Sequence, residues 1–154
     1  MIGIWYPLPM KTDESISGVF QAEQKSSVKR PLFVCGVSAG FPSPADDYID
    51  QRLDLNELLI QNQAATFFVR VAGDSMRDAG INHDDILIVD RSLEAVNGKI
   101  IIAVVNGEMT LKRLVHNGSG CRLVAENPEY PAIEISDGVD FTVWGVVTSV
   151  IHQL

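Results

Sequence analysis

The stretch KIIIAVVNGEMTLKRLV, residues 99–115, decides the fold. Two runs rich in β-branched residues flank Asn106-Gly107, and Asn-Gly between such runs is the strongest short-range signal for a two-residue hairpin turn. This turn also fixes the register of the two strands, because it places Ile101 opposite Lys112. The stretch therefore predicts a long, regular β-hairpin.

Segments on both sides of this hairpin carry a similar β signal. Strands are predicted over residues 65–71 and 86–90 and in three later segments, CRLVAE, AIEIS and FTVWGVVTSVIHQL. The pattern Asp54-Leu55-Asn56-Glu57 resembles a capping box and predicts a short helix, LNELLIQN. A mainly β domain with one or two short helices follows from these patterns.

The N-terminal region has weaker patterns. Residues 11–30 are polar and poorly periodic, which predicts a mobile arm with at most a transient helical turn. Residues 1–10 are apolar but short, are broken by Pro7 and Pro9, and lack a basic start, so no signal peptide is expected. Because no apolar run reaches about 18 residues, no membrane span is expected either.

The composition is that of a globular protein, with 46% hydrophobic residues and a net charge of −8. An acidic surface repels a phosphate backbone unless a local basic patch is present, and the sequence shows no such patch. Direct binding to nucleic acid is therefore not expected, and the acidity is accounted for by a well-solvated surface.

The metal-binding and redox residues form no recognisable site. Cys35 and Cys121 make neither a disulfide framework nor a metal motif, which favours a reduced cytoplasmic protein. His83, His116 and His152 lie at no spacing typical of a metal site or a catalytic triad, and solvated positions are expected for His83 and His116. We expect no cofactor and no metal.

Lys112 is the first candidate for chemistry. Residues two apart on a strand share a face, so Lys112 points to the same side as Thr110 and Leu114. Desolvation among apolar neighbours lowers the pKa of an ammonium group, which makes lysine suitable as a general base near neutral pH. The alternative is that Lys112 lies at the rim of the sheet with its head in water.

AGDSM, residues 72–76, contains the second candidate. Gly73 lets the backbone turn tightly after a predicted strand, which leaves the Ser75 hydroxyl and nearby amides facing a cleft. The alternative is that Ser75 caps a short helix, with Asp78 as the partner acid. These residues alone leave both interpretations open.

Three longer strings carry a family resemblance. GFPSPADDYIDQRLDLNELLIQNQAATFFVRVAGDSM at 40–76, ILIVD at 86–90 and NGEMTLKRL at 106–114 occur in this order without gaps. Over about residues 40–150 the chain resembles the UmuD/MucA-like SOS mutagenesis proteins, which belong to the LexA-type family of self-cleaving serine peptidases. The resemblance implies a LexA/signal-peptidase-like fold of coiled β-sheets with one or two short helices, preceded by a flexible N-terminal arm.

The resemblance also assigns roles to the two candidates. It implies that Ser75 is the nucleophile and Lys112 the general base of a Ser–Lys dyad, which needs no histidine. The substrate would be the protein itself: residues 1–39 would be an arm removed by self-cleavage, and residues 40–154 a peptidase-like dimerisation domain. The arm is longer here than in UmuD, which leaves its packing before cleavage open.

Two bonds compete as the cleavage site. Family members cut just before GFPSP, which implies the bond between Ala39 and Gly40, whereas a cysteine before the cut in UmuD makes Cys35–Gly36 the alternative. Because an extended segment points alternate side chains into the pockets, a cut after Ala39 presents Ala39 and Val37, and a cut after Cys35 presents the bulky Phe33. The smaller pair favours Ala39–Gly40.

The implied function is that of a self-cleaving accessory subunit of an error-prone translesion DNA polymerase. The implied partners are a second copy in a homodimer, a RecA–single-stranded DNA filament that stimulates cleavage, and a UmuC-like Y-family polymerase. The alternatives are a LexA-like self-cleaving repressor, for which residues 1–39 are short, and a non-catalytic β interaction module.

Overall fold

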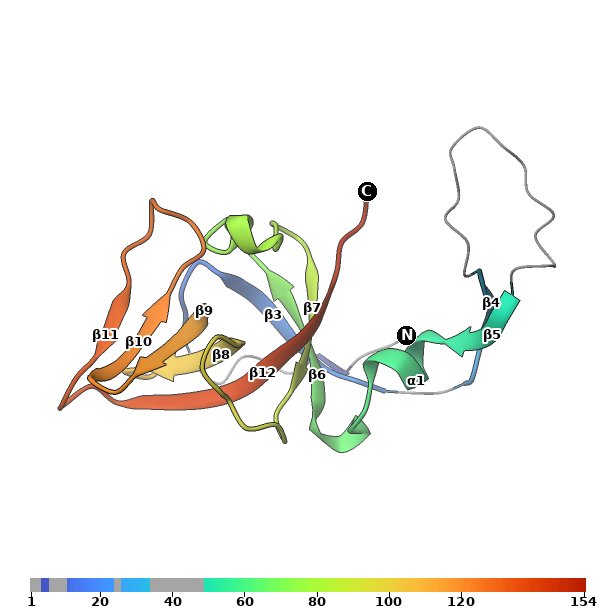
Figure 1. Cartoon of the computed structure of the whole chain (residues 1–154), viewed down its shortest axis with the longest axis horizontal. Helices are drawn as coiled ribbons and strands as arrows, with labels where there is room; N and C mark the ends of the chain where they lie inside the picture. Colours follow the sequence, from blue (N-terminus) through green and yellow to red (C-terminus); the bar gives the residue numbers. More distant parts are fainter. Residues whose placement is uncertain (1–3, 6–10, 24–25, 34–48) are drawn as a thin grey trace.

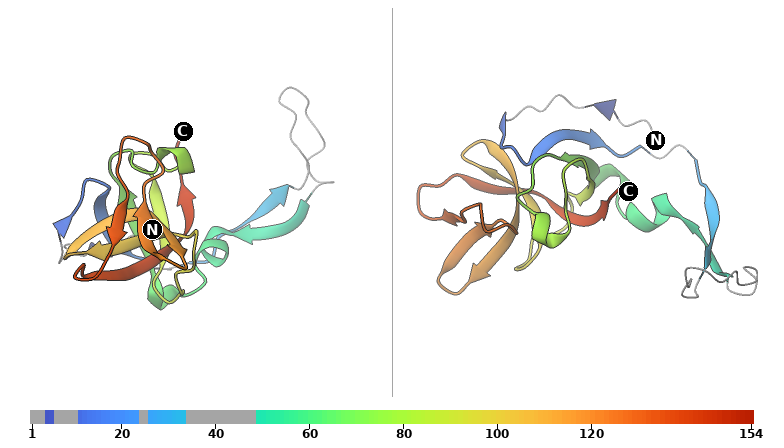
Figure 2. Two further views of the ribbon diagram at one scale, coloured as in Figure 1. Left: turned by 60° about the vertical axis from the view of Figure 1, so that its left-hand side comes forward. Right: turned by 90° about the horizontal axis from the view of Figure 1, so that it is seen from above.

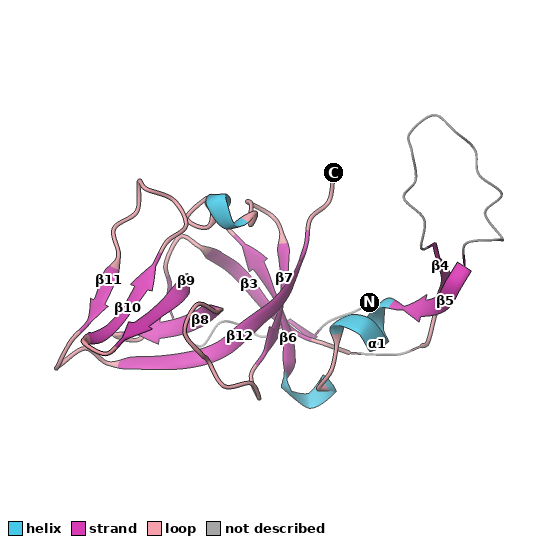
Figure 3. Ribbon diagram, viewed as in Figure 1, coloured by secondary structure: helices cyan, strands magenta, loops and turns pink. Residues whose placement is uncertain are grey.

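The structure is a computed structural model that describes residues 4–5, 11–23, 26–33 and 49–154. Strands dominate the described residues, as Figure 3 shows, and helices are few and short. The mainly β class predicted from the sequence is confirmed. Most of the strands belong to one curled sheet, whose pairing is antiparallel except where β2 meets β9.

The main sheet has ten strands, in the spatial order β1-β3-β6-β7-β12-β8-β9-β10-β11, with β2 also paired to β9. Their bounds are β1 Ile4–Trp5, β2 Lys11–Thr12, β3 Ile16–Gln21, β6 Thr66–Val71, β7 Ile86–Asp90, β8 Ile100–Val105, β9 Glu108–Asn117, β10 Gly120–Val124, β11 Ile133–Ile135 and β12 Phe141–Ile151.

A second, two-stranded sheet lies outside the first. It consists of β4 (Lys29–Phe33) and β5 (Ile49–Asp54), and it projects from the main sheet beyond the helix α1, Leu55–Leu59 (Figure 1). The short helix was predicted, and Asp54 caps it by accepting a hydrogen bond from the Asn56 amide at 2.8 Å. Two single 3₁₀ turns, η2 (Gln63–Ala65) and η3 (Arg77–Ala79), complete the fold.

The hairpin predicted over residues 99–115 is formed by β8 and β9. Asn106 and Gly107 both have positive φ angles, 49° and 81°, as a type I′ turn requires. The predicted register is confirmed, with Ile101 paired to Lys112 and Ala103 to Thr110. Lys112 therefore stands on the predicted face of the sheet.

The N-terminal region differs from its prediction. Instead of a mobile arm with a transient helical turn, residues 11–23 contain β2 and β3, and β3 lies along β6 as an antiparallel neighbour (Figure 2). Ile16 and Val19 are buried in the main core. The prediction failed because β3 does not alternate: its register shifts between Ile16 and Gly18, and such a bulge disrupts the two-residue period.

The curled sheet has two halves on either side of β12, one formed by β1, β3, β6 and β7 and the other by β8 to β11. The largest core cluster joins these two halves. It gathers buried apolar side chains from β3, β6, β7, β8 and β9, among them Val69, Leu87, Ile102 and Leu111, none of which is exposed. Burial of this kind stabilises a fold by about 25 cal/mol per Å² of apolar surface. The core thus fixes the position of β6, which precedes Ser75, relative to β9, which carries Lys112.

Strand β12 connects the same two halves through the backbone. Its first part, from Phe141 to Val146, pairs with β8, and its second part, from Val146 to Ile151, pairs with β7. The register shifts within each part, and a Cβ atom at Gly145 would lie 2.5 Å from Val89 Cγ1. Glycine is therefore required where β12 crosses from one half to the other.

No helix among the described residues is long and apolar enough to span a membrane.

Candidate active site

Ser75 lies on a tight turn that follows β6. Gly73 has a φ of +67°, and a Cβ atom there would lie 3.2 Å from the carbonyl oxygen of Glu14. The left-handed φ and the close approach both favour glycine at this position. Ser75 itself is buried, and it does not cap a helix: η3 begins after Met76 without a side-chain cap, so the helix-cap interpretation is wrong.

Replacement of Gly73 tests this local geometry. Gly73→Ala is expected to lower the free energy of unfolding by roughly 1–2 kcal/mol, because an L-residue in the left-handed region is strained. Urea denaturation of the full chain measures the loss. Gly118→Ala is the control, since a Cβ atom at Gly118 meets no atom within 4 Å. Equal stability of the two variants would contradict the prediction.

Lys112 is buried in β9, with 5% of the residue exposed. The interpretation that it lies at the rim of the sheet with its head in water is therefore wrong. Burial lowers the pKa of Lys112 from its ordinary value, while the nearby Asp13 carboxylate opposes this shift. A lysine that loses its proton more readily is what general-base chemistry needs.

Ser75 and Lys112 line the same cavity, although they come from different halves of the sheet. The cavity wall combines the turn after β6, the middle of β9, a tyrosine from the loop after β10 and three residues of the N-terminal segment. The residues are Asp13, Glu14, Ser15, Ala72, Gly73, Asp74, Ser75, Lys112 and Tyr130. The two residues predicted as a pair are thus brought together in one cleft.

The ammonium group of Lys112 is held by a polar network. Its Nζ donates to Thr110 Oγ1 at 2.9 Å and to the Leu111 carbonyl oxygen at 3.1 Å, and it lies 3.6 Å from Asp13 Oδ2. The Asp13 carboxylate also accepts hydrogen bonds from the hydroxyls of Thr110 and Ser15. These groups fix the position of the Lys112 head inside the cleft.

The turn that carries Ser75 is supported from the loop after β10. Tyr130 donates from its hydroxyl to Asp74 Oδ1 at 2.8 Å, and Asn127 donates from Nδ2 to the Asp74 carbonyl oxygen at 2.9 Å. The hydrogen bond to Asp74 raises the pKa of Tyr130, so its phenol is neutral.

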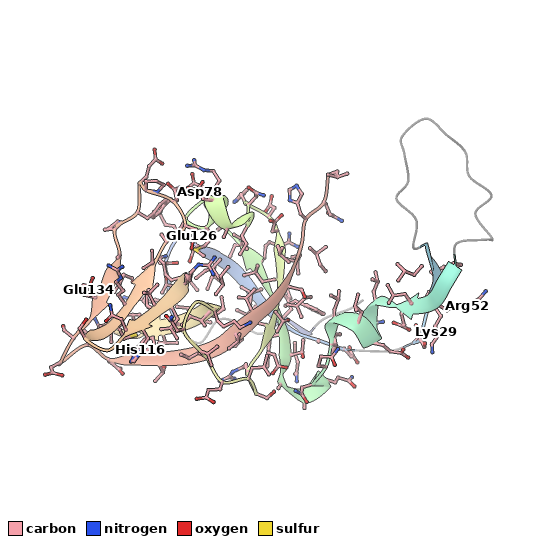
Figure 4. The ribbon with its side chains drawn as sticks, viewed as in Figure 1. Lys29, Arg52, Asp78, His116, Glu126 and Glu134 are labelled. Atoms are coloured by element: carbon pink, nitrogen blue, oxygen red, sulfur yellow. The ribbon has the colours of Figure 1, made fainter. Side chains whose placement is uncertain are left out.

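Figure 4 shows Asp78 and Glu126 close together in this region, where the Asp78 amide donates to the Glu126 carbonyl oxygen at 2.8 Å.

Several site residues were missed from the sequence. Thr110 could have been predicted as a neighbour of Lys112, because residues two apart on a strand share a face. Asp13 could not, because it is 97 residues from Thr110 and its segment was interpreted as a mobile arm. Contacts of this kind depend on the tertiary fold and leave no trace in local spacing.

The histidines lie outside the cleft lining. His83 accepts a hydrogen bond from the Gly73 amide at 3.2 Å, so it supports the Ser75 turn from outside, although two thirds of its side chain is exposed. His152 pairs with the buried Asp85 at 2.6 Å. His116 is exposed on β9 (Figure 4), and no group of ligand-type residues in the described ranges could hold a metal ion.

The predicted cleavage site, Ala39 and Gly40, lies outside the described residues, as does the competing pair Cys35 and Gly36. The strands before and after it, β4 and β5, pair with each other as the two-stranded sheet. Figure 4 labels Lys29 and Arg52 on these strands.

Comparisons with known proteins identify the family of the chain. The model of the Peptidase S24-like family matches residues 31–148. The chain is 44% identical to protein ImpA of Salmonella typhimurium over 82% of this chain and 86% of ImpA, and 41% identical to protein MucA of Escherichia coli over 84% and 90%. It is 33% identical to the LexA repressor of Cupriavidus taiwanensis, over 93% of this chain and 66% of the repressor.

The chain therefore belongs to the S24-like family of self-cleaving serine peptidases. Within it, ImpA and MucA are UmuD-like SOS mutagenesis proteins, which confirms the resemblance seen in the sequence.

Proposed function

We propose that this protein is a self-cleaving accessory subunit of an error-prone translesion DNA polymerase, and that Ser75 and Lys112 perform the cleavage. The observation that carries the proposal is the shared cavity, which is lined by both a serine on a tight turn and a buried lysine. Family membership and the similarity to SOS mutagenesis proteins support the same function.

The proposed chemistry needs no other catalytic group. Neutral Lys112 takes the proton of the Ser75 hydroxyl as its oxygen attacks the backbone carbonyl carbon of Ala39, and amides of the Asp74–Ser75 turn stabilise the oxyanion. Collapse breaks the bond to Gly40, whose amine leaves with the proton from Lys112. Water then hydrolyses the ester on Ser75, which restores the free hydroxyl.

The bond between Ala39 and Gly40 is proposed on the grounds of its small side chains. An extended substrate segment would present Ala39 and Val37 to the pockets, and Gly40 allows close approach of the nucleophile. The cut would separate residues 1–39, the arm, from residues 40–154, which would form the mature, dimeric domain.

The proposed partners follow from the family relationship. A RecA–single-stranded DNA filament would favour the conformation in which the arm enters the cleft, and would thereby stimulate cleavage. The trimmed homodimer would then join a UmuC-like Y-family polymerase in the cytoplasm.

Measurement of fragment mass tests the proposal. The purified full chain is incubated with activated RecA filament, or alone at alkaline pH, and analysed by mass spectrometry. We expect loss of residues 1–39 and a new N-terminus at Gly40. A new N-terminus at Gly36 would contradict the choice of bond, and an intact chain under every condition would leave a non-catalytic interaction module.

A self-cleaving repressor is the second candidate, because the LexA repressor is also similar. Such a protein needs a DNA-binding domain, usually a helix-turn-helix. The described residues before 34 form strands β1 to β4 and no helix. A specific gel shift with operator DNA would favour the repressor over the polymerase subunit.

A further inference from the structure

The segment from Lys11 to Ser15 crosses the catalytic cleft. On one side, the Asp13 amide donates to the Met109 carbonyl oxygen of β9 at 2.9 Å. On the other side, the Ala72 amide, next to the Ser75 turn, donates to the Ser15 carbonyl oxygen at 2.9 Å. The segment thus connects the strand that carries the proposed base to the turn that carries the proposed nucleophile.

β3 anchors this segment firmly. It pairs with β6 over most of its length (Figure 2). Ile16 and Val19 on this strand, and Ala22 directly after it, are each at most 5% exposed. A segment that buries three apolar side chains and completes a ladder of backbone hydrogen bonds is an integral part of the sheet. Residues 16–22 are therefore held along β6 by both packing and backbone pairing.

The segment also influences the protonation state of Lys112. An ammonium group has three donors and no acceptor, whereas a general base needs a free lone pair. Within the described residues, the polar partners of Lys112 Nζ are Thr110 Oγ1, the Leu111 carbonyl oxygen and Asp13 Oδ2. Two of these accept hydrogen bonds from Nζ, and the Asp13 carboxylate at ion-pair distance favours the protonated, inactive form against the larger opposing effect of burial.

We propose that the β6 edge and the Thr110–Lys112 pocket form a binding site for an extended peptide that carries a carboxylate three residues before a buried isoleucine. In the intact chain residues 11–22 occupy this site, and their occupation inhibits the dyad. The inference rests on the proposed role of Lys112 as general base. It assigns to this chain's own N-terminal segment a second role, that of a built-in inhibitor of the peptidase.

Among the described residues, four titratable groups line the cavity with Lys112: Asp13, Glu14, Asp74 and Tyr130. Of these, Asp13 is the group that forms an ion pair with Lys112. The Asp74 carboxylate accepts a hydrogen bond from Tyr130, and the Tyr130 phenol is neutral. Asp13 lies at ion-pair distance from Lys112 and raises its pKa against the effect of burial. Its replacement by a neutral isostere should therefore release the proton from Lys112.

The first test compares the pH profile of self-cleavage in full chains that carry Asp13→Asn or Glu108→Gln. Asparagine keeps the shape of Asp13 but loses its charge, and we expect the profile to move about one pH unit lower, with about tenfold faster cleavage at neutral pH. Glu108→Gln removes the same charge from an exposed position outside the cavity, and its profile should match the wild type. An unchanged or slower Asp13→Asn protein would overturn the inhibitory role.

The second test does not depend on cleavage. The Nζ of Lys112 is titrated by ¹⁵N NMR in full-length Ser75→Ala protein, with and without Asp13→Asn. We expect a lower pKa of Lys112 in the double variant, and equal values would overturn the inference. If the wild type never cleaves itself but this shift is present, the proposed function fails while the contact between Asp13 and Lys112 stands.

The third test concerns the docking of the strand. A recognition site for an added protease is inserted between Gln24 and Lys25, so that cutting frees residues 1–24 from the rest of the chain. We expect the short piece to co-elute with the body in size-exclusion chromatography at neutral pH, because β3 holds it on β6. Its separation under these conditions would overturn the proposed binding site.

Discussion

Ser75→Ala is expected to lower the rate of self-cleavage by about 10⁴-fold or more, because it removes the attacking oxygen itself. The cavity offers one other serine, Ser15, whose hydroxyl donates to Asp13 and accepts from the Leu111 amide. The rate is measured as the loss of intact full-length chain at alkaline pH and with activated RecA filament. Alanine fits the buried site of Ser75, so the fold should be retained.

Two matched variants make this result specific. Ser119→Ala removes an exposed hydroxyl outside the cavity and should cleave at the wild-type rate. Lys112→Met keeps the length of the buried side chain but has no basic nitrogen, so it should be as inactive as Ser75→Ala. A Ser75→Ala protein that still loses residues 1–39 at the wild-type rate would exclude Ser75 as the nucleophile.

Self-cleavage in the absence of RecA is expected to accelerate about tenfold for each pH unit below the pKa of Lys112 and to level off above it. The sign follows from the role of Lys112, which acts as a base only after losing its proton. Because burial is the largest influence and lowers this pKa, the plateau should begin below the ordinary value of 10.5. The measurement is the initial rate of cleavage across a pH series.

The unfolding transition, followed by circular dichroism at each pH, is the control for this profile. A rate that rises only where the fold is lost would reflect unfolding and not deprotonation. A rate independent of pH across the series would contradict a lysine as the base. A rate that falls as pH rises would indicate a group that must stay protonated.

The hairpin and its lysine could be predicted because their determinants are local. Asn106-Gly107 specifies the turn, the turn specifies the register, and the register places Lys112 on a mostly apolar face. The strands β6 and β7 likewise have continuous β-prone sequences, and β7 has the predicted bounds, Ile86–Asp90.

The chemistry of the site could be predicted only in part. The residues alone left Ser75 between a nucleophile and a helix cap, and the family resemblance supplied the pairing with Lys112. In the structure both residues line one cavity. The contact of Asp13 with Lys112 had no local signal, because it depends on β3 entering a sheet whose other members lie far along the chain.

β12 carries neither residue of the proposed dyad, yet it sets the span between them. Ser75, the proposed nucleophile, follows β6, which neighbours β12 through β7. Lys112, the proposed base, lies on β9, which neighbours β12 through β8. The curvature of this one strand, which crosses between the two halves of the sheet at Gly145, therefore sets the separation of Ser75 and Lys112. The separation of the two proposed dyad residues thus depends on a strand that contributes no residue to the cavity lining.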